Sequence, residues 1–158
     1  MKLDPNKKCI LVSACLLGVP SRYDGKSKTN NLAIQLVEFF NVIPICPESD
    51  SGLPTPRDPS EIVGNKVLSS KGKDVTEFFK RGAQMALELA KKYNVQLAVM
   101  QEKSPSCGFK SVHNGLFDGG MVKGQGFTTK LLLENNVQVI PDTNLEAFIK
   151  SLREKNND

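Results

Sequence analysis

Residues Cys9–Cys15 read CILVSAC, a short apolar run with almost no alternation of polar and apolar side chains. Such a run is typical of a strand that is covered on both faces, as the strands of a parallel sheet are. Similar runs occur at Asn41–Cys46, Val95–Met100 and Val137–Ile140. Pro44 lacks an amide donor, so its strand is expected at an edge or a bulge. The sequence therefore predicts a mainly parallel sheet of about four strands.

Segments with helical spacing separate these runs. Apolar residues recur on one helical face in residues 31–40, 74–93 and 143–152, and a short helix is expected over 128–135. Strands that alternate with helices imply right-handed crossovers and a Rossmann-like, three-layer α/β domain. One such domain accounts for residues 1–158. Residues 47–73 are expected to form a long loop.

The composition is ordinary for a globular domain and narrows the functional classes. The net charge is +4, which permits an anionic ligand without demanding one. No apolar run approaches the roughly 20 residues of a membrane span. Only six residues separate Lys8 from Cys15, fewer than the apolar region of a signal peptide needs. A chain of this length can bury a core without disulfides, so we expect a reducing, cytoplasmic compartment.

Three of the four cysteines fall at the same end of the predicted strands. Cys15, Cys46 and Cys107 each end a strand or lie just beyond one, whereas Cys9 begins the first strand at the opposite edge. Ligands of open α/β sheets bind outside the carboxyl ends of the strands. The three thiols can therefore converge on one site, although a single cysteine is more often simply a buried core residue.

Three thiolates leave several kinds of site open. A structural zinc site needs four ligands, and the chain holds a single histidine. An iron–sulfur cluster accepts three thiolates, and the remaining iron is then open to a substrate. The alternatives are a zinc- or cluster-stabilised binding module without enzymatic activity and an enzyme that uses Cys107 as a nucleophile.

Five ordered motifs along the chain resemble the thiouracil desulfidase family. They are LVSACLLG (11–18), RYDG (22–25), CPE (46–48), GLPTPR (52–57) and SPSCG (104–108). The resemblance implies a 4Fe–4S cluster that is held by three cysteines and leaves one iron for the sulfur of a thiolated uracil. The ligands would be Cys15, Cys46 and Cys107. Many members have cysteine where this chain has Ser21, which suggests that this position is not an essential ligand.

The resemblance also implies the reaction and its acid/base residues. A thiocarbonyl and water would give a carbonyl and sulfide without redox change. Glu48 would act as the acid/base and Ser104 as the catalytic serine. The substrate would be a thiolated base, nucleoside or nucleotide such as 4-thio-UMP.

Basic residues on the predicted ligand-side loops bear on the form of that substrate. Arg22, Arg57, Lys103 and Lys123 are placed where they would meet a phosphate. A tRNA substrate is disfavoured because no added domain or basic, aromatic-rich surface is visible. The sequence predicts neither the position of the sulfur on the ring nor the oligomeric state.

Overall fold

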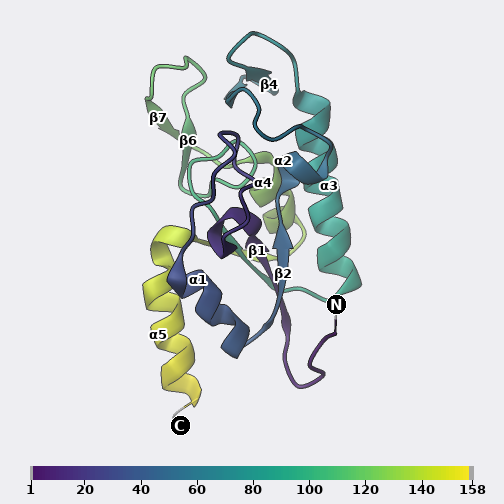
Figure 1. Cartoon of the computed structure of the whole chain (residues 1–158), viewed down its shortest axis with the longest axis vertical. Coiled ribbons are helices and arrows are strands. Elements are labelled where there is room, and N and C mark those ends of the chain that lie inside the picture. The colour runs from purple at the N-terminus through teal and green to yellow at the C-terminus, as the bar shows by residue number, and fades with distance from the viewer. Residues whose placement is uncertain (1, 157–158) are drawn as a thin grey trace.

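The computed structural model describes residues 2–156, and a parallel sheet lies at its centre (Figure 1). Its four strands stand in the order β2-β1-β5-β8, and every neighbouring pair is parallel. The strands are β1 (Cys9–Ser13), β2 (Asn41–Ile45), β5 (Leu97–Met100) and β8 (Gln138–Pro141). The predicted α/β class and the parallel sheet are confirmed.

Helices cover both faces of this sheet, which explains the uninterrupted apolar runs. On one side lie α1 (Asn31–Gln35) and α5 (Leu145–Asn156), and on the other α3 (Thr76–Lys92) and α4 (Phe127–Glu134) (Figure 1). Successive residues of a strand point to opposite faces. Leu11 therefore packs toward α3 and α4, while its neighbours Ile10 and Val12 pack toward α1 and α5.

The order of the strands creates a crossing point beside β1. From β1 the chain passes to β2 on one side, and it later returns to β5 on the other side. Such a switch point opens a crevice beyond the carboxyl ends of the strands. Pro44 faces no further strand, because β2 is the edge of the sheet, as its missing amide donor predicts.

Several element boundaries differ from the sequence-based expectation. The first strand ends at Ser13, and Cys15 lies in the 3-10 helix η1 (Ala14–Leu17). The helix expected over 31–40 is α1, capped by the side chain of Asn30 and continued by the 3-10 helix η2 (Leu36–Glu38). The two 3-10 helices η1 and η2 are wound more tightly than an α-helix, and such turns commonly connect or end regular elements.

The segment expected to be a long loop contains regular structure. It begins with the one-turn helix α2 (Pro47–Asp50) and continues into a hairpin of β3 (Ser60–Val63) and β4 (Lys66–Ser69). Gly64 has a φ of 64° and, with Asn65, makes the tight turn of that hairpin. Four-residue strands are too short to show a convincing periodicity, which is why the pattern did not reveal them.

A second hairpin stands beside the first, beyond the carboxyl ends of the sheet. It consists of β6 (Ser111–His113) and β7 (Met121–Lys123). Both hairpins lie at the top of the molecule in Figure 1, on the side where β1 and β2 end. Within the described residues, no helix combines the length and apolarity needed to cross a membrane.

Candidate functional site

The cavity beyond the carboxyl ends of β1, β2 and β5 brings the three predicted thiols together. Cys15, Cys46 and Cys107 all line this cavity, whose volume is about 480 Å³. Each of them is a free thiol, as is Cys9. Cys9 lies at the other end of β1 and packs against the apolar cluster under α3 and α4.

Cys15 is held by the turn that ends β1. Its thiol donates to Oε1 of Gln101 at 3.0 Å, and the amide of Gln101 in turn donates to the Ser13 hydroxyl at 3.0 Å. Burial raises the pKa of the Cys15 thiol to about 11, and the nearby Cys46 adds to the shift while Arg22 opposes it. Without a metal, this thiol stays protonated at neutral pH.

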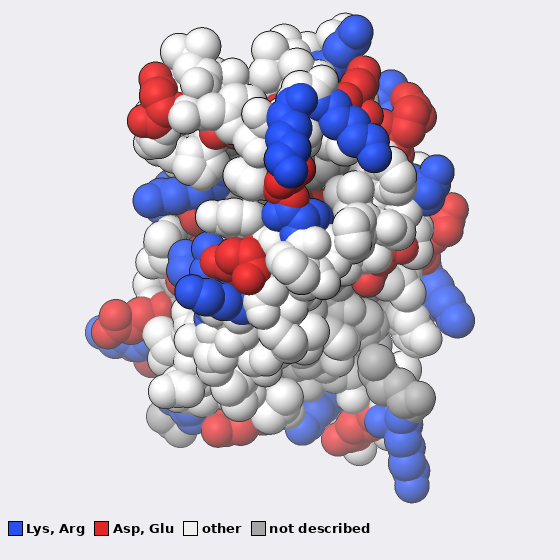
Figure 2. All heavy atoms as spheres, turned by 45° about the horizontal axis from the view of Figure 1, so that its top comes forward, with Lys and Arg blue, Asp and Glu red and all other residues white. Residues whose placement is uncertain are grey.

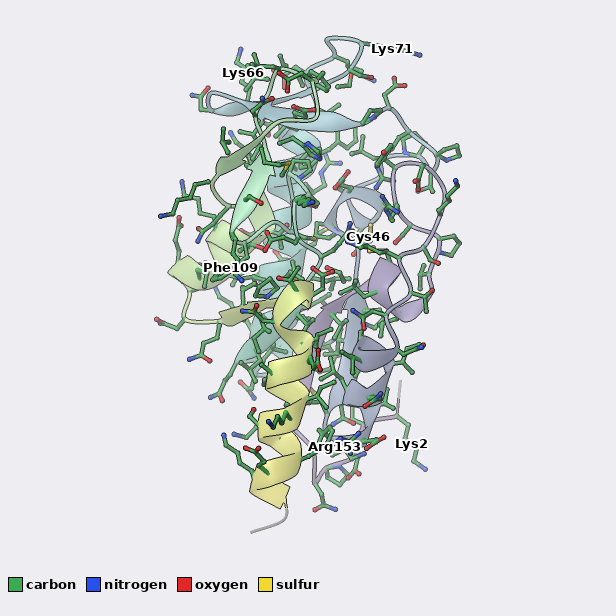
Figure 3. The ribbon with its side chains drawn as sticks, turned by 90° about the vertical axis from the view of Figure 1, so that its left-hand side faces the viewer. Lys2, Cys46, Lys66, Lys71, Phe109 and Arg153 are labelled. Atoms are coloured by element: carbon green, nitrogen blue, oxygen red, sulfur yellow. The ribbon has the colours of Figure 1, made fainter. Side chains whose placement is uncertain are left out.

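Cys46 and Glu48 are placed by α2, which is seated on α3. Figure 3 shows Cys46 just beyond the end of β2 and below the β3–β4 hairpin, which carries Lys66 and is followed by the turn that carries Lys71. The Cys46 amide donates to Oδ2 of Asp50 at 3.0 Å, which caps the short helix. Gly82 of α3 lies directly under the Pro47 carbonyl, where a methyl group would overlap it.

Cys107 belongs to a rigid turn at the start of α4. The Ser104 hydroxyl accepts the amides of Ser106 at 3.1 Å and Cys107 at 2.9 Å. The Ser106 carbonyl accepts the first free amides of α4, from Thr128 at 2.9 Å and Thr129 at 3.2 Å. The first amides of a helix have no acceptor within the helix, and here the carbonyl of the turn supplies one.

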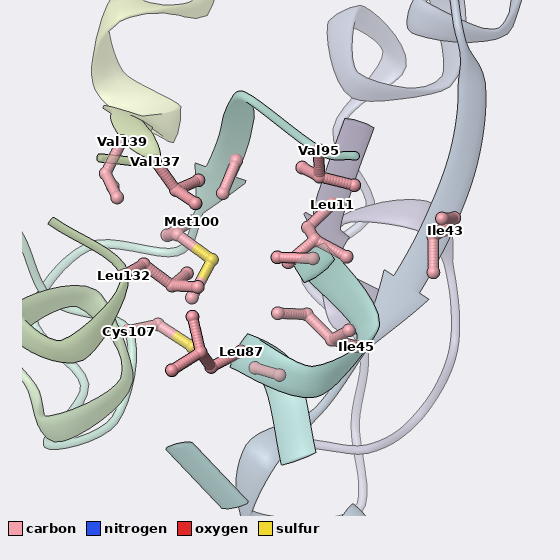
Figure 4. Packing of buried hydrophobic residues seen from close by; sticks show 13 residues of the cluster. Leu11, Ile43, Ile45, Leu87, Val95, Met100, Cys107, Leu132, Val137 and Val139 are labelled. Atoms are coloured by element: carbon pink, nitrogen blue, oxygen red, sulfur yellow. The ribbon is translucent and has the colours of Figure 1, made fainter. Parts of the chain in front are cut away.

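Cys107 is buried, as Cys15 is, whereas Cys46 is only partly buried. In Figure 4 it lies beside Leu87, Met100 and Leu132 in the apolar cluster between the sheet and its helices. Burial raises the pKa of Cys107 to about 12, and hydrogen bonds from Ser106 and Ser13 only partly offset that effect. Three thiolates at this point would repel one another, and a cationic metal centre removes that penalty.

The donor set fits a sulfur-ligated cluster. Three free cysteines from three separate loops border one cavity, and soft thiolates are the ligands that iron–sulfur clusters use. Among residues 2–156, no three His, Cys, Asp or Glu side chains converge closely enough for a single metal ion.

Glu48 is the carboxylate beside these thiols, and it is held from two sides. Its Oε2 accepts the Ser106 hydroxyl at 2.9 Å, and its Oε1 accepts Nε of Arg57 at 3.3 Å. The Ser106 hydroxyl also lies 2.9 Å from the Ser104 hydroxyl and 3.6 Å from the Cys107 sulfur. Glu48, Ser106 and Ser104 therefore form one hydrogen-bonded chain that runs along the cavity wall to a thiol.

Ser106 was missed by the sequence-based reasoning, although it stands between two residues that were singled out. Its partner Glu48 is 58 residues away in the chain, so no local spacing indicates the contact. The signal available was its position next to a candidate ligand within SPSCG.

Arg57 lies behind Glu48 rather than at the mouth of the cavity. The exposed fractions of the Arg57 and Glu48 side chains are 7% and 14%. The guanidinium also donates to the carbonyls of Ser21 and Pro54 and to the Thr55 hydroxyl. These contacts fix the direction of the carboxylate.

The other predicted phosphate contacts are more open. Arg22 lines the cavity, and its nearest carboxylate oxygen, from Asp24, is 3.9 Å away. Lys103 lines the cavity with an exposed side chain. Lys123 lies on β7 and is not among the described residues that border the cavity.

Charges on the face that carries the hairpins are mixed in sign. In Figure 2, Lys and Arg side chains alternate with Asp and Glu, and no continuous basic surface forms on this face. Extended nucleic-acid grooves combine clustered basic charge with aromatic side chains. The exclusion of a tRNA substrate stays a prediction of the sequence.

Known proteins share this sequence pattern and this arrangement. The sequence profile of the 2-thiouracil desulfurase family matches residues 10–144. The chain belongs to the 2-thiouracil desulfurase family. All three cavity thiols lie inside the part that this desulfurase profile matches, whereas Cys9 lies outside it.

Two relatives match this chain over nearly its whole length. The uncharacterized protein YbbK of Bacillus subtilis strain 168 is 36% identical over 150 residues, which cover 89% of this chain and 99% of YbbK. The solved structure of the 4Fe-4S-dependent thiouracil desulfidase TudS is 42% identical and superposes with a TM-score of 0.86. That match covers 93% of this chain and 99% of TudS.

Proposed function

We propose that this chain removes sulfur from a thiolated uracil with a 4Fe–4S cluster that is held by Cys15, Cys46 and Cys107. The observation that carries the proposal is that three free thiols and a partly buried, ion-paired carboxylate line one cavity. The likeness to TudS, which is 4Fe-4S-dependent, supports the same cofactor in this chain.

The bound cluster would supply a thiophilic iron, not held by a protein ligand, that binds the substrate's sulfur and polarises its bond to carbon. The protein's task is then to place the ring carbon near a water molecule and to move protons. The low-polarity surroundings of Cys107 keep bulk water away from that region.

Glu48 is the group placed to move those protons. The oxygen of water bonds to the ring carbon, the carbon–sulfur bond breaks, and both protons of the water end on the sulfide. Glu48 takes the first proton and returns it to the departing sulfur. Ser106 and Ser104 extend its hydrogen-bonded chain along the cavity, and Arg57 holds the carboxylate in place.

The substrate would be a free base, a nucleoside or a nucleotide such as 4-thio-UMP, and the cavity volume of about 480 Å³ supports a small molecule of this class. Arg22 and Lys103 are the cations that a phosphate would meet at the rim. Arg57 contributes indirectly, because its donors are engaged by protein groups. Four free thiols favour a reducing compartment, and we place the activity in the cytoplasm.

The two competing functions have less support. A nucleophilic cysteine needs a stabilised thiolate, whereas burial raises the pKa of Cys107 to about 12. A purely structural metal module gives no reason to bury an Arg57–Glu48 ion pair at the rim of the metal site.

Anaerobic reconstitution followed by a substrate panel tests the proposal. Iron-loaded protein should release sulfide from 2-thiouracil, 4-thiouracil or 4-thio-UMP, and the product should be the matching oxo compound. Iron-free protein and Cys15→Ala should release none, while Cys9→Ala should match the wild type. Full iron loading without sulfide release from any of the three would establish a non-enzymatic module instead.

A further inference from the structure

The outer wall of the cavity is formed by the loop between β6 and β7, and this loop carries an exposed aromatic ring. Phe117 lines the cavity and yet is 39% exposed. Its neighbour Leu116 is 73% exposed and is not among the cavity residues. The loop therefore turns one large apolar side chain toward the cavity and the other toward solvent.

The backbone at Phe117 adopts a conformation that few aromatic residues take. Its φ is 55°, in the left-handed region that normally suits glycine or asparagine. Residues held in such conformations persist only where the surrounding structure fixes them, and they cluster at binding sites. The ring is thus presented to the cavity by a specific loop shape.

Glu61 of the neighbouring hairpin is the group that fixes this shape. Its Oε1 accepts the amide of Gly115 at 2.9 Å and the amide of Phe117 at 3.2 Å. The residue is only 7% exposed, and no ion pair to it is found within residues 2–156. Glu61 also lines the cavity, and the hydrogen bonds that its carboxylate accepts from the two loop amides hold the loop beside it.

We propose that Phe117 binds the substrate by stacking on its pyrimidine ring, with Glu61 as the residue that positions it. The inference rests on the function proposed above. A thiolated pyrimidine is flat and polarisable, and an aromatic face is the protein surface that binds such a ring with little demand on its substituents. Stacking on one face would hold the ring so that its sulfur can reach the cluster site, which the three thiols border in the same cavity.

Steady-state kinetics of the iron-loaded protein with its best thiouracil substrate test this role. Phe117→Ala should raise KM by roughly 5- to 150-fold, the loss expected for one base–aromatic stack. It should leave kcat within a few-fold, because the iron site and Glu48 are untouched. Phe117→Trp should retain a low KM. Leu116→Ala, one residue away on the same loop, is the matched control and should keep the wild-type KM.

Glu61 is tested with an isosteric and a truncated variant. Glu61→Gln retains an oxygen that can accept both loop amides, so its KM should stay near the wild-type value. Glu61→Ala should raise KM toward that of Phe117→Ala without a matching fall in kcat. If Glu61→Ala does not fold, the Phe117 series decides the question alone.

Titration of the iron-loaded protein with uracil provides a readout that does not depend on turnover. Uracil should bind the wild type and Leu116→Ala equally, and Phe117→Ala more weakly by the same factor as its rise in KM. If Phe117→Ala kept the KM and the uracil affinity of the wild type, the stacking role would be wrong and the desulfidase function would be unaffected. Uracil binding that depends on Phe117 in a protein that releases no sulfide would overturn the function and leave the stacking role standing.

Discussion

Cys9 and Cys15 lie at the two ends of one strand of the chain and yet have different surroundings. Cys9 is half-buried against apolar side chains where β1 begins. Cys15 lies beyond the other end, lines the cavity with Cys46 and Cys107, and donates to Gln101. In the proposed function, position therefore decides which of the two thiols can hold the cluster, because only the carboxyl end of β1 faces the crevice at the switch point.

Single substitutions of the four cysteines should give the largest contrast. Cys15→Ala, Cys46→Ala and Cys107→Ala should each lose bound iron and all sulfide release, because each removes one cluster ligand. Cys9→Ala should retain both. Anaerobic iron and sulfide quantification with a sulfide-release assay makes the measurement. If Cys9→Ala lost its iron, the assignment of the cluster ligands to the carboxyl end of β1 alone would be wrong.

Glu48→Gln should separate proton transfer from cluster binding at the cavity end of the strands. The variant keeps its hydrogen-bonding shape but cannot exchange a proton, so kcat should fall by about 10²- to 10⁴-fold. Iron content should stay at the wild-type level. Undiminished kcat would exclude Glu48 as the acid/base, and lost iron would make it part of the metal site.

Gly82→Ala should show that the placement of Cys46 and Glu48 depends on the close packing of α2 on α3. The added methyl overlaps the Pro47 carbonyl, so α2 must shift and carry Cys46 and Glu48 with it. We expect the free energy of unfolding to fall by about 1–3 kcal/mol, as overpacking usually costs. Gly72→Ala tests a left-handed glycine with open space around it, far from this contact, and should leave iron loading unchanged. Chemical denaturation and iron quantification measure both effects.

The stability of the iron-free protein should depend on pH through the two buried thiols at the cavity end, Cys15 and Cys107. Burial raises the pKa of Cys107 from 9.0 to about 12 and that of Cys15 to about 11. The unfolded chain then loses these protons first, so stability is full below pH 9 and falls as the pH rises toward the folded values. Between pH 9 and 10 the free energy of unfolding should fall by about 1 kcal/mol for each thiol.

Variants assign that slope to individual thiols. Cys107→Ala should flatten the dependence measured by urea denaturation at several pH values, whatever its effect on absolute stability. A slope that persists in Cys107→Ala and Cys15→Ala would show that other groups cause it.

The central sheet and the three thiols that border the cavity could be predicted from the sequence. The two hairpins beyond the carboxyl ends of the sheet could not. CILVSAC and its counterparts are apolar throughout because helices cover both faces, and this pattern survives in a single sequence. Parallel strands then bring distant cysteines to one rim without any local signal between them.

The hairpins and the Glu48 assembly depend on contacts that a single sequence does not display. Strands of three or four residues carry no clear period, so β3, β4, β6 and β7 were hidden among glycines and prolines. Arg57 was predicted as a phosphate contact, and the structure instead shows its donors engaged by Glu48 and nearby backbone. The Ser106–Glu48 hydrogen bond joins the turn before α4 to α2, and these two segments are far apart in the sequence.

Mössbauer spectroscopy of protein reconstituted with ⁵⁷Fe tests the central claim most directly. Addition of thiouracil should change the parameters of one iron site of the cluster and leave the sites on Cys15, Cys46 and Cys107 as they were, whereas uracil should not shift that site. A spectrum in which every iron is unaffected by thiouracil, or a preparation that takes up no cluster, would contradict the account.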